Sequence, residues 1–262
     1  MERLLATHFN LLAAIVALFM FGGMFALLEI GYRIGRRRRL AEGKDIAGLG
    51  TLEGGVFGLM GLLLAFSFSG AAGRFDDRRN MIVEEANDIG TAWLRLDLMP
   101  IESQPAIKDS FRSYVDSRIA AYRVLPDYDA ALGFIKRGED LQGVIWKQAV
   151  AGTLGGWPPA SSLLLPALNA MFDITTTRKF ATRAHPPLLL YCLLAVLVLA
   201  GSMLAGYGMS GSPKRPWTHS IPFVLMVSLT IWVILDLEYP RLGFIRVDNF
   251  DQAIVDVRTS MK

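Results

Sequence analysis

The stretch GLMGLLLAFSFSGAAGRFDDRRN, residues 58–80, joins an apolar, glycine-rich half directly to a densely charged half. No proline interrupts this join, and the next proline in the chain is Pro100. Because proline breaks helices, its absence predicts one helix that leaves the lipid and continues to Met99. Such a helix would have about 45 residues and a length close to ~70 Å at ~1.5 Å per residue.

The composition is that of a membrane protein. The chain has 262 residues, of which 52% are hydrophobic, and its mean hydropathy is +0.36. A formal charge of +3 is too small to argue for a nucleic-acid partner, so we expect none. The single cysteine, Cys192, excludes an intrachain disulfide.

Four apolar segments predict a multi-pass protein of the cell inner (plasma) membrane, since about 20 apolar residues cross a bilayer core of ~30 Å. The first is followed by a basic cluster and has no small-residue cleavage site, which indicates a retained anchor and not a cleaved signal peptide. The four predicted spans are Leu11–Ile30, Gly54–Gly70, Leu188–Tyr207 and Ile221–Leu235.

Apolar residues recur at helical spacing through the segment between the second and third spans. We expect helices over 74–99, 108–124, 128–151 and 163–184, with the Gly- and Pro-rich stretch 152–162 as a loop. The predicted fold is therefore all-α, with four transmembrane helices and a helical extramembrane domain. The predicted domains are 1–73, 74–186, 187–238 and 239–262.

Basic residues in the two short loops predict the orientation. The first loop contains Arg33, Arg36, Arg37, Arg38, Arg39 and Lys44, and the second contains Lys214 and Arg215. Short loops rich in Lys and Arg stay cytoplasmic, so we expect the N-terminus, the middle domain and the C-terminus outside. Arginines that flank the middle domain leave the inverse orientation open. The run of residues 36–39 also suits anionic lipid headgroups, at about 1 kcal/mol per basic residue.

Small residues three or four apart mark the second span, among them Gly54, Gly58, Gly61 and Ala65. Such spacing lets helix backbones approach closely in lipid. One interpretation is a packing face within a single helical bundle. The other is a helix repeated around the axis of an oligomer, with a narrow apolar pore that gates by dewetting and with Ser67 and Ser69 facing water near its exit.

The run GLLLAF, followed after eight residues by Arg74-Phe75 and then by Arg78-Arg79, resembles the pore helix of bestrophins. The whole chain resembles more closely the bacterial bestrophin-like integral membrane proteins, a group of unknown function. The motifs that carry this second resemblance are GLGTLEGGVFGLMGLLLAFSFSGAAGRFDDRR, VEEANDIGTAWLRLDLMP and ILDLEYPRLGFIRV.

The resemblance implies a pentameric channel that passes inorganic anions through a neck formed by the second span. By the spacing from Phe66 to Arg74, the neck positions would be Gly58, Leu62 and Phe66. The chain departs from the bestrophin pattern at Gly58, at Phe75-Asp76, where bestrophins have paired tryptophans, and in its strongly basic first loop.

Acidic residues at 84, 85 and 88 raise the question of a metal site. Hard cations need several oxygens that converge from different elements. A single helix with Arg78, Arg79 and Arg95 close by instead predicts ion pairs within that helix. The three histidines have no Cys or His at ligand spacing, and no catalytic motif is present. We therefore expect no metal, no cofactor, no catalytic residue and no enzyme activity.

Two glutamates lie near predicted membrane boundaries. Glu29 has Arg33 four residues on, which predicts an ion pair near the interface. Glu53 precedes Gly54 at the start of the second span, where it is either a pore-mouth residue or an acid favoured by the helix dipole. Two functions remain: an oligomeric, ion-passing channel, or a membrane-anchored helical scaffold or sensor without a permeation path.

The predicted orientation is testable with single cysteines at Ser103 and Ser212 in a Cys192→Ser background. An impermeant thiol reagent applied outside the cell should label position 103 and spare position 212. Labelling at position 212 alone would establish the inverse orientation and overturn the charge argument.

Overall fold

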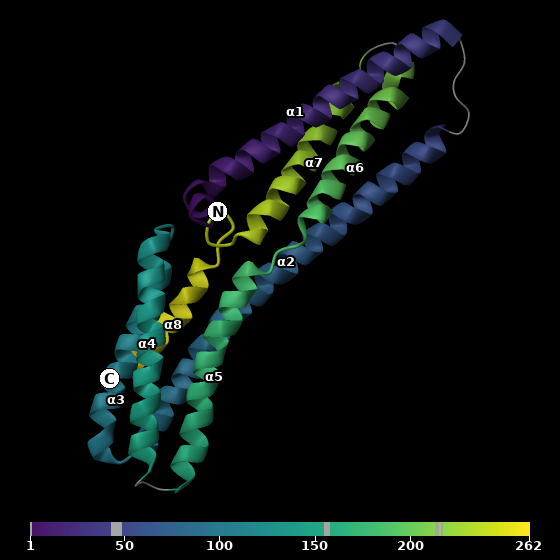
Figure 1. Ribbon diagram of the computed structural model, residues 1–262. Coiled ribbons are helices and arrows are strands. Elements are labelled where there is room, and N and C mark those ends of the chain that lie inside the picture. Colours follow the sequence, from purple (N-terminus) through teal and green to yellow (C-terminus); the bar gives the residue numbers. More distant parts are fainter. Residues whose placement is uncertain (1, 43–48, 155–157, 213–214, 216) are drawn as a thin grey trace. The chain divides into compact units, whose positions relative to one another are not determined.

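The computed structural model describes residues 2–42, 49–154, 158–212, 215 and 217–262, and these residues form helices and short connections without any strand (Figure 1). The helices are α1 (Glu2–Glu42), α2 (Leu49–Arg95), α3 (Gln104–Arg123), α4 (Tyr128–Thr153), α5 (Pro158–Arg183), α6 (Leu188–Gly208), α7 (Trp217–Glu238) and α8 (Gln252–Ser260). Short 3₁₀ turns cover Leu96–Leu98, Ile101–Ser103, Met209–Gly211 and Asp248–Asp251. The all-α prediction is confirmed, whereas Lys44 and Lys214 of the orientation argument lie outside the described residues.

Four helices are long and apolar enough to cross a membrane. They lie within His8–Ala41, Gly50–Leu98, Pro159–Gly211 and Trp217–Glu238. The chain is therefore a membrane protein by helix length and composition, as its sequence predicts.

The predicted helix through residues 58–80 is present as part of α2, which has 47 residues. Its apolar part ends at Gly73, and the residues from Arg74 onward carry the charged half. The regular α-helix ends at Arg95, and a 3₁₀ turn covers Leu96–Leu98 before Pro100. The continuity of this helix is confirmed.

The helix α5 begins earlier than expected. Residues 158–162 were predicted to belong to a loop, yet α5 starts at Pro158. Proline fits the first turn of a helix, because its missing N–H would have no acceptor there. The dipeptide Pro158-Pro159 therefore starts this helix.

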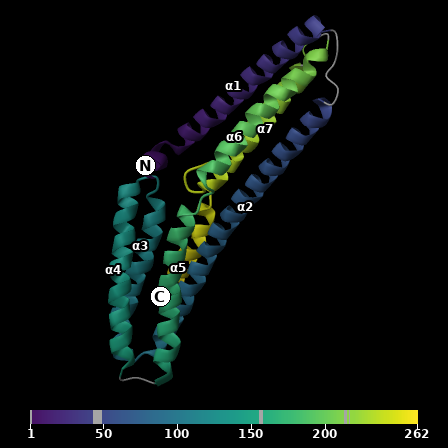
Figure 2. The same cartoon turned by 45° about the vertical axis from the view of Figure 1, so that its right-hand side comes forward.

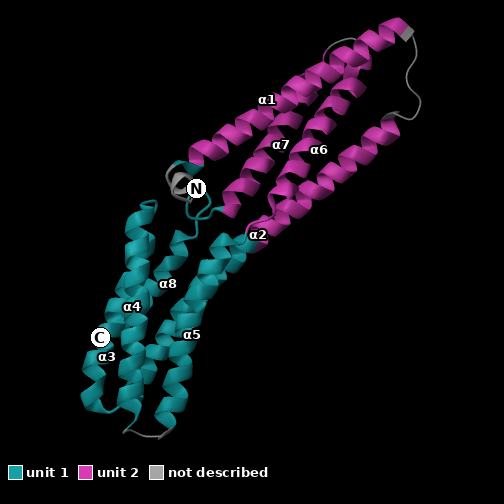
Figure 3. Cartoon of the chain, viewed as in Figure 1, with its two compact units in different colours: residues 1–9, 74–184, 239–262 teal, residues 10–73, 185–238 magenta. Residues whose placement is uncertain are grey.

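The chain divides into two compact units, coloured separately in Figure 3. Unit 1 comprises residues 1–9, 74–184 and 239–262, and unit 2 comprises residues 10–73 and 185–238. In unit 1, α4 packs along α3 and along α5 (Figure 2). The buried core of this unit includes Ile82, Ile89, Phe111, Tyr114, Ile145, Leu168 and Met171.

An arginine of α2 caps the last turn of α5 in unit 1. The last carbonyl groups of a helix have no partner within the helix. Arg78 is 7% exposed, and its Nε and Nη2 donate to the carbonyl oxygens of Ala181 and Ala184 at 3.1 and 3.0 Å. A positive side chain is also favourable at this end of the helix dipole.

Unit 2 contains close backbone contacts between α1 and α6. A Cβ placed at Gly206 would collide with the carbonyl oxygen of Leu28, and one at Gly31 would collide with that of Met203. Close approach of this kind is typical of small residues in membrane helices. The hydrophobic core of this unit includes Met20, Met24, Met60, Leu194, Val198 and Val224.

Replacing Gly206 with alanine should therefore destabilise unit 2, because the colliding atom belongs to backbone and has no rotamer to change. Overpacking of this kind costs about 1–3 kcal/mol. Gly143→Ala is the control, since a Cβ there meets nothing within 4 Å and alanine stabilises a helix by up to ~1 kcal/mol. Thermal unfolding in detergent should show a lower Tm for Gly206→Ala and an equal or higher Tm for Gly143→Ala. Equal stability of both variants would contradict the close contact.

Candidate functional site

One side of α2 in unit 2 is left exposed by the other described residues of the chain. A Cβ placed at Gly54, Gly58 or Gly61 would meet nothing within 4 Å. On the same side, Leu62 is 50% exposed and Phe66 is 65% exposed. We call this surface the open face of α2, and it contains the three residues assigned to the neck by resemblance.

The two serines of the predicted pore exit lie on different sides of the helix. Ser69 is exposed, whereas Ser67 is half-buried. Two residues along an α-helix differ by about 200° in direction. Only Ser69 therefore belongs to the open face.

Glu53 points away from the open face. A Cβ at Gly208 of α6 would lie 2.7 and 2.8 Å from its two carboxylate oxygens. Its Oε1 atom is enclosed and accepts no hydrogen bond from the described residues. The carboxylate of Glu53, the predicted pore-mouth residue, thus lies between α2 and α6 inside unit 2.

Residues 36–39 were predicted to belong to the first loop, but they lie in the last turns of α1, because the helix continues to Glu42. Arg36, Arg37 and Arg38 are exposed, and Arg39 is half-buried, with its guanidinium group against Gly211. The predicted contact of this run with lipid headgroups therefore concerns exposed side chains at Arg36 and Arg37.

The predicted pair between Glu29 and Arg33 is confirmed, with 2.6 Å between Oε1 and Nε. Arg215 of the second basic loop also donates to Glu29 Oε1, at 2.8 Å. This second contact joins Arg215, which precedes α7, to α1 through one carboxylate.

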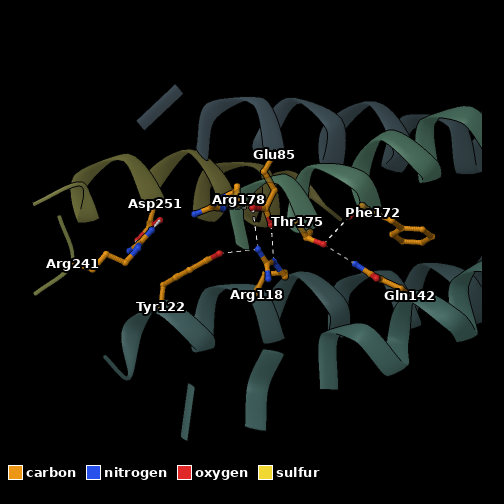
Figure 4. Close-up of polar contacts among 9 residues, drawn as sticks. All are labelled: Glu85, Arg118, Tyr122, Gln142, Phe172, Thr175, Arg178, Arg241 and Asp251. Atoms are coloured by element: carbon orange, nitrogen blue, oxygen red, sulfur yellow. Dashed lines mark hydrogen bonds and ion pairs between the residues drawn. The ribbon is translucent and has the colours of Figure 1, made fainter. Parts of the chain in front are cut away.

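A buried ion cluster occupies the core of unit 1 (Figure 4). Glu85 of α2 is 0% exposed. Arg118 of α3 donates from Nε to Oε1 at 2.7 Å and from Nη2 to Oε2 at 3.1 Å. Arg178 of α5 donates from Nη1 to the same Oε2. One carboxylate therefore joins three helices.

The prediction of ion pairs within α2 is wrong for Glu85. Its side chain lies on the same face of the helix as Ile82, Ala86 and Ile89, all buried in unit 1. Partners for it must therefore come from other helices. The prediction is correct for Arg79, which pairs with Asp76 at 3.3 Å within the helix.

Tyr122 of α3 adds an aromatic ring to this cluster. The guanidinium carbons of Arg118, Arg178 and Arg241 lie 5.3, 4.6 and 4.1 Å from its ring centroid. Distances of this size permit cation–π attraction. Arg118 also donates from Nη2 to the Tyr122 hydroxyl at 2.8 Å.

Arg241 brings the segment after α7 into the cluster. Its two terminal nitrogens donate to the two carboxylate oxygens of Asp251 at 2.7 and 2.8 Å, which is a bidentate pair. We define the buried ion cluster as Glu85, Arg118, Tyr122, Arg178, Arg241 and Asp251.

The electrostatics keep Glu85 ionised. Burial alone would raise the pKa of this carboxyl, but the guanidinium groups of Arg118 and Arg178 outweigh it and lower the pKa to about 2. For Asp88, burial and then the charges of Glu84 and Glu85 raise the pKa. Two acids three residues apart thus shift in opposite directions, because only one of them has arginine partners.

Arg118 and Arg178 were not predicted from the sequence to be partners of Glu85, although a signal for both exists. Arg118 follows Phe111 by seven residues and Tyr114 by four, so it continues the apolar stripe of α3. Arg178 continues the row of Met171 and Ile174 in the same way. A charged residue in line with a buried stripe indicates a buried partner. Among the described residues, no group of three or more Asp, Glu, His or Cys is placed to hold a metal ion.

Comparisons of this chain with protein-family models, with curated proteins and with solved structures give no match. The bestrophin-like resemblance therefore stays a prediction, and the geometry of the chain carries the functional argument.

Replacing Glu85 with glutamine should strongly destabilise unit 1, because Arg118 and Arg178 would keep buried charges without a counter-charge. Breaking a buried pair in this way costs about 3–5 kcal/mol. The neighbouring variant Glu84→Gln is the control, since residue 84 is exposed. A thermal or denaturant unfolding measurement should separate the two variants, and equal stability would contradict the role of the cluster.

The same pair predicts acid sensitivity. Because folding lowers the pKa of Glu85, the unfolded chain binds the proton more readily, and the pair stabilises the fold only while the carboxyl is ionised. The contribution of Glu85 to the free energy of unfolding should be at its maximum above about pH 4.5 and should fall as the pH drops towards about 2. The loss over this range should be smaller in Glu85→Gln than in the wild-type protein.

Proposed function

We propose that this chain assembles into a homo-oligomer and passes inorganic ions along an axis lined by the open face of α2. The observation that carries the proposal is the contrast between two sets of glycines in unit 2. Gly31 and Gly206 allow backbone contact between α1 and α6, whereas a Cβ at Gly54, Gly58 or Gly61 of α2 would meet none of the described residues within 4 Å.

Glycines in the middle of a helix need a physical reason. Each costs about 1 kcal/mol relative to alanine, so the three on the open face cost about 3 kcal/mol together. Close approach of another helix offsets this cost in lipid, and none of the described helices of the same chain supplies it. A second copy of α2, related by rotation about an axis, would supply it at every subunit.

The apolar side chains of the open face suit a constriction. Leu62 and Phe66 are one helical turn apart and both project from the chain. Around an axis they would form two apolar rings, which can close a narrow path by dewetting. By resemblance the oligomer is a pentamer and the ions are anions.

In this proposal, unit 1 is the extramembrane domain. The part of α2 that belongs to it carries the charged sequence from Arg74 onward, and its core contains the buried ion cluster. Both short basic loops are then cytoplasmic and unit 1 faces outward.

The double variant Leu62→Ala with Phe66→Ala tests the pore. Truncation of two rings widens the constriction, so efflux of chloride or potassium from proteoliposomes should rise above that of the wild-type protein. Fully buried large-to-alanine changes cost about 2–5 kcal/mol each. Because these two side chains are at least half exposed in the chain, the Tm of the subunit should change much less.

Leu229→Ala is the matched control, because this leucine of α7 is 54% exposed and lies off the open face. Its flux should equal that of the wild-type protein. Gly61→Leu should reduce oligomer size while helix content is kept, since its side chain has room in a single subunit. Flux equal to that of empty liposomes in both the wild type and the double variant, at intact oligomer size, would favour a scaffold or sensor.

A further inference from the structure

Arg178 offers more hydrogen-bond donors than the buried ion cluster uses. Its Nη1 donates to Glu85, while its Nε and Nη2 donate to no residue in the described part of the chain. The side chain is only 7% exposed. Neither nitrogen is among the fully enclosed polar atoms that lack a partner, so both keep contact with the exterior.

The other two arginines of the cluster have little such capacity. Arg118 uses Nε and Nη2 on Glu85 and donates from Nη2 to Tyr122 as well. Arg241 places both terminal nitrogens on Asp251. Among the described residues, Arg118 leaves only Nη1 and Arg241 only Nε without an acceptor, whereas Arg178 leaves the neighbouring Nε and Nη2 together.

The charges of the cluster also do not balance. Three guanidinium groups face the two carboxylates of Glu85 and Asp251, which leaves one positive charge. Asp248 does not change this balance, because it is shared between Arg241 and Arg246. An uncompensated buried charge is costly, and a bound anion would remove that cost.

We propose that Arg178 and Tyr122 form a binding site for an oxyanion, namely a carboxylate or phosphate group. The Nε and Nη2 atoms of one arginine form a fork that matches two oxygens of such a group. The Tyr122 hydroxyl accepts its hydrogen bond from Arg118, so its own hydrogen is available to the same ligand. A halide ion has a single centre, so the two N–H groups reach it in bent hydrogen bonds, whereas two oxygens of a carboxylate or phosphate accept both in nearly linear ones.

The test measures binding of inorganic phosphate to the full chain by isothermal titration calorimetry, at constant ionic strength in sodium chloride. The wild-type protein in neutral phosphatidylcholine nanodiscs should bind phosphate, and acetate should compete with it. Arg178→Lys keeps the positive charge beside Glu85 but loses the fork. It should therefore bind phosphate about tenfold more weakly or worse, with the fold intact.

The control is Arg258→Gln, which removes an arginine that pairs with Asp116 away from the cluster and should leave phosphate binding unchanged. Nanodiscs that contain phosphatidic acid separate two sources of the ligand: loss of phosphate binding there identifies a lipid headgroup, and unchanged binding identifies a free anion. Absence of phosphate binding by the wild type in chloride, or equal affinity in Arg178→Lys, would overturn the proposal.

Discussion

The carboxylate of Glu85 lies at 0% exposure between the guanidinium groups of Arg118 and Arg178, and three helices of unit 1 meet there. Removing charges from water is costly, and their mutual attraction compensates for this only when the hydrogen bonds are well made. Arg118 donates to both oxygens of this carboxylate, at 2.7 and 3.1 Å, and Arg178 supplies a second positive partner. The positions of α2, α3 and α5 within unit 1 therefore depend on one another through a single side chain.

The contact between α1 and α6 in unit 2 depends on glycines, which have no side chain. Gly31 and Gly206 bring the backbones of α1 and α6 together, and any Cβ at either position would collide with a carbonyl oxygen. Glycines on the open face of α2 lie where no other described residue comes close. The number of glycines in a helix therefore does not show whether they pack against a helix of the same chain or face away from the chain. That depends on which helix lies next to them.

Much of the fold follows from local patterns in the sequence. The length of the apolar segments predicts the four membrane-type helices. The absence of proline between residues 58 and 99 predicts the continuous α2. The pair of Glu29 with Arg33 follows from i, i+4 spacing alone. The partners of Glu85 do not, because Arg118 and Arg178 are 33 and 93 residues away in the chain. For the same reason the sequence left open that Glu53 lies against Gly208, since only the packing of α2 on α6 brings them together.

The identity of residue 85 also limits how α3 and α5 can pack on α2. An apolar residue there would suit several registers, because Ile82, Ala86 and Ile89 offer a continuous apolar surface on either side. A carboxylate suits only the register in which both arginines reach it. A shift of one turn, about 5.4 Å, would leave Glu85 against apolar neighbours and two guanidinium groups without their acceptor. Buried polar groups that fix register in this way are best known from coiled coils. We infer that the ion pair contributes more to the uniqueness of the packing in unit 1 than to its net stability, since an apolar replacement of all three residues would avoid the desolvation cost.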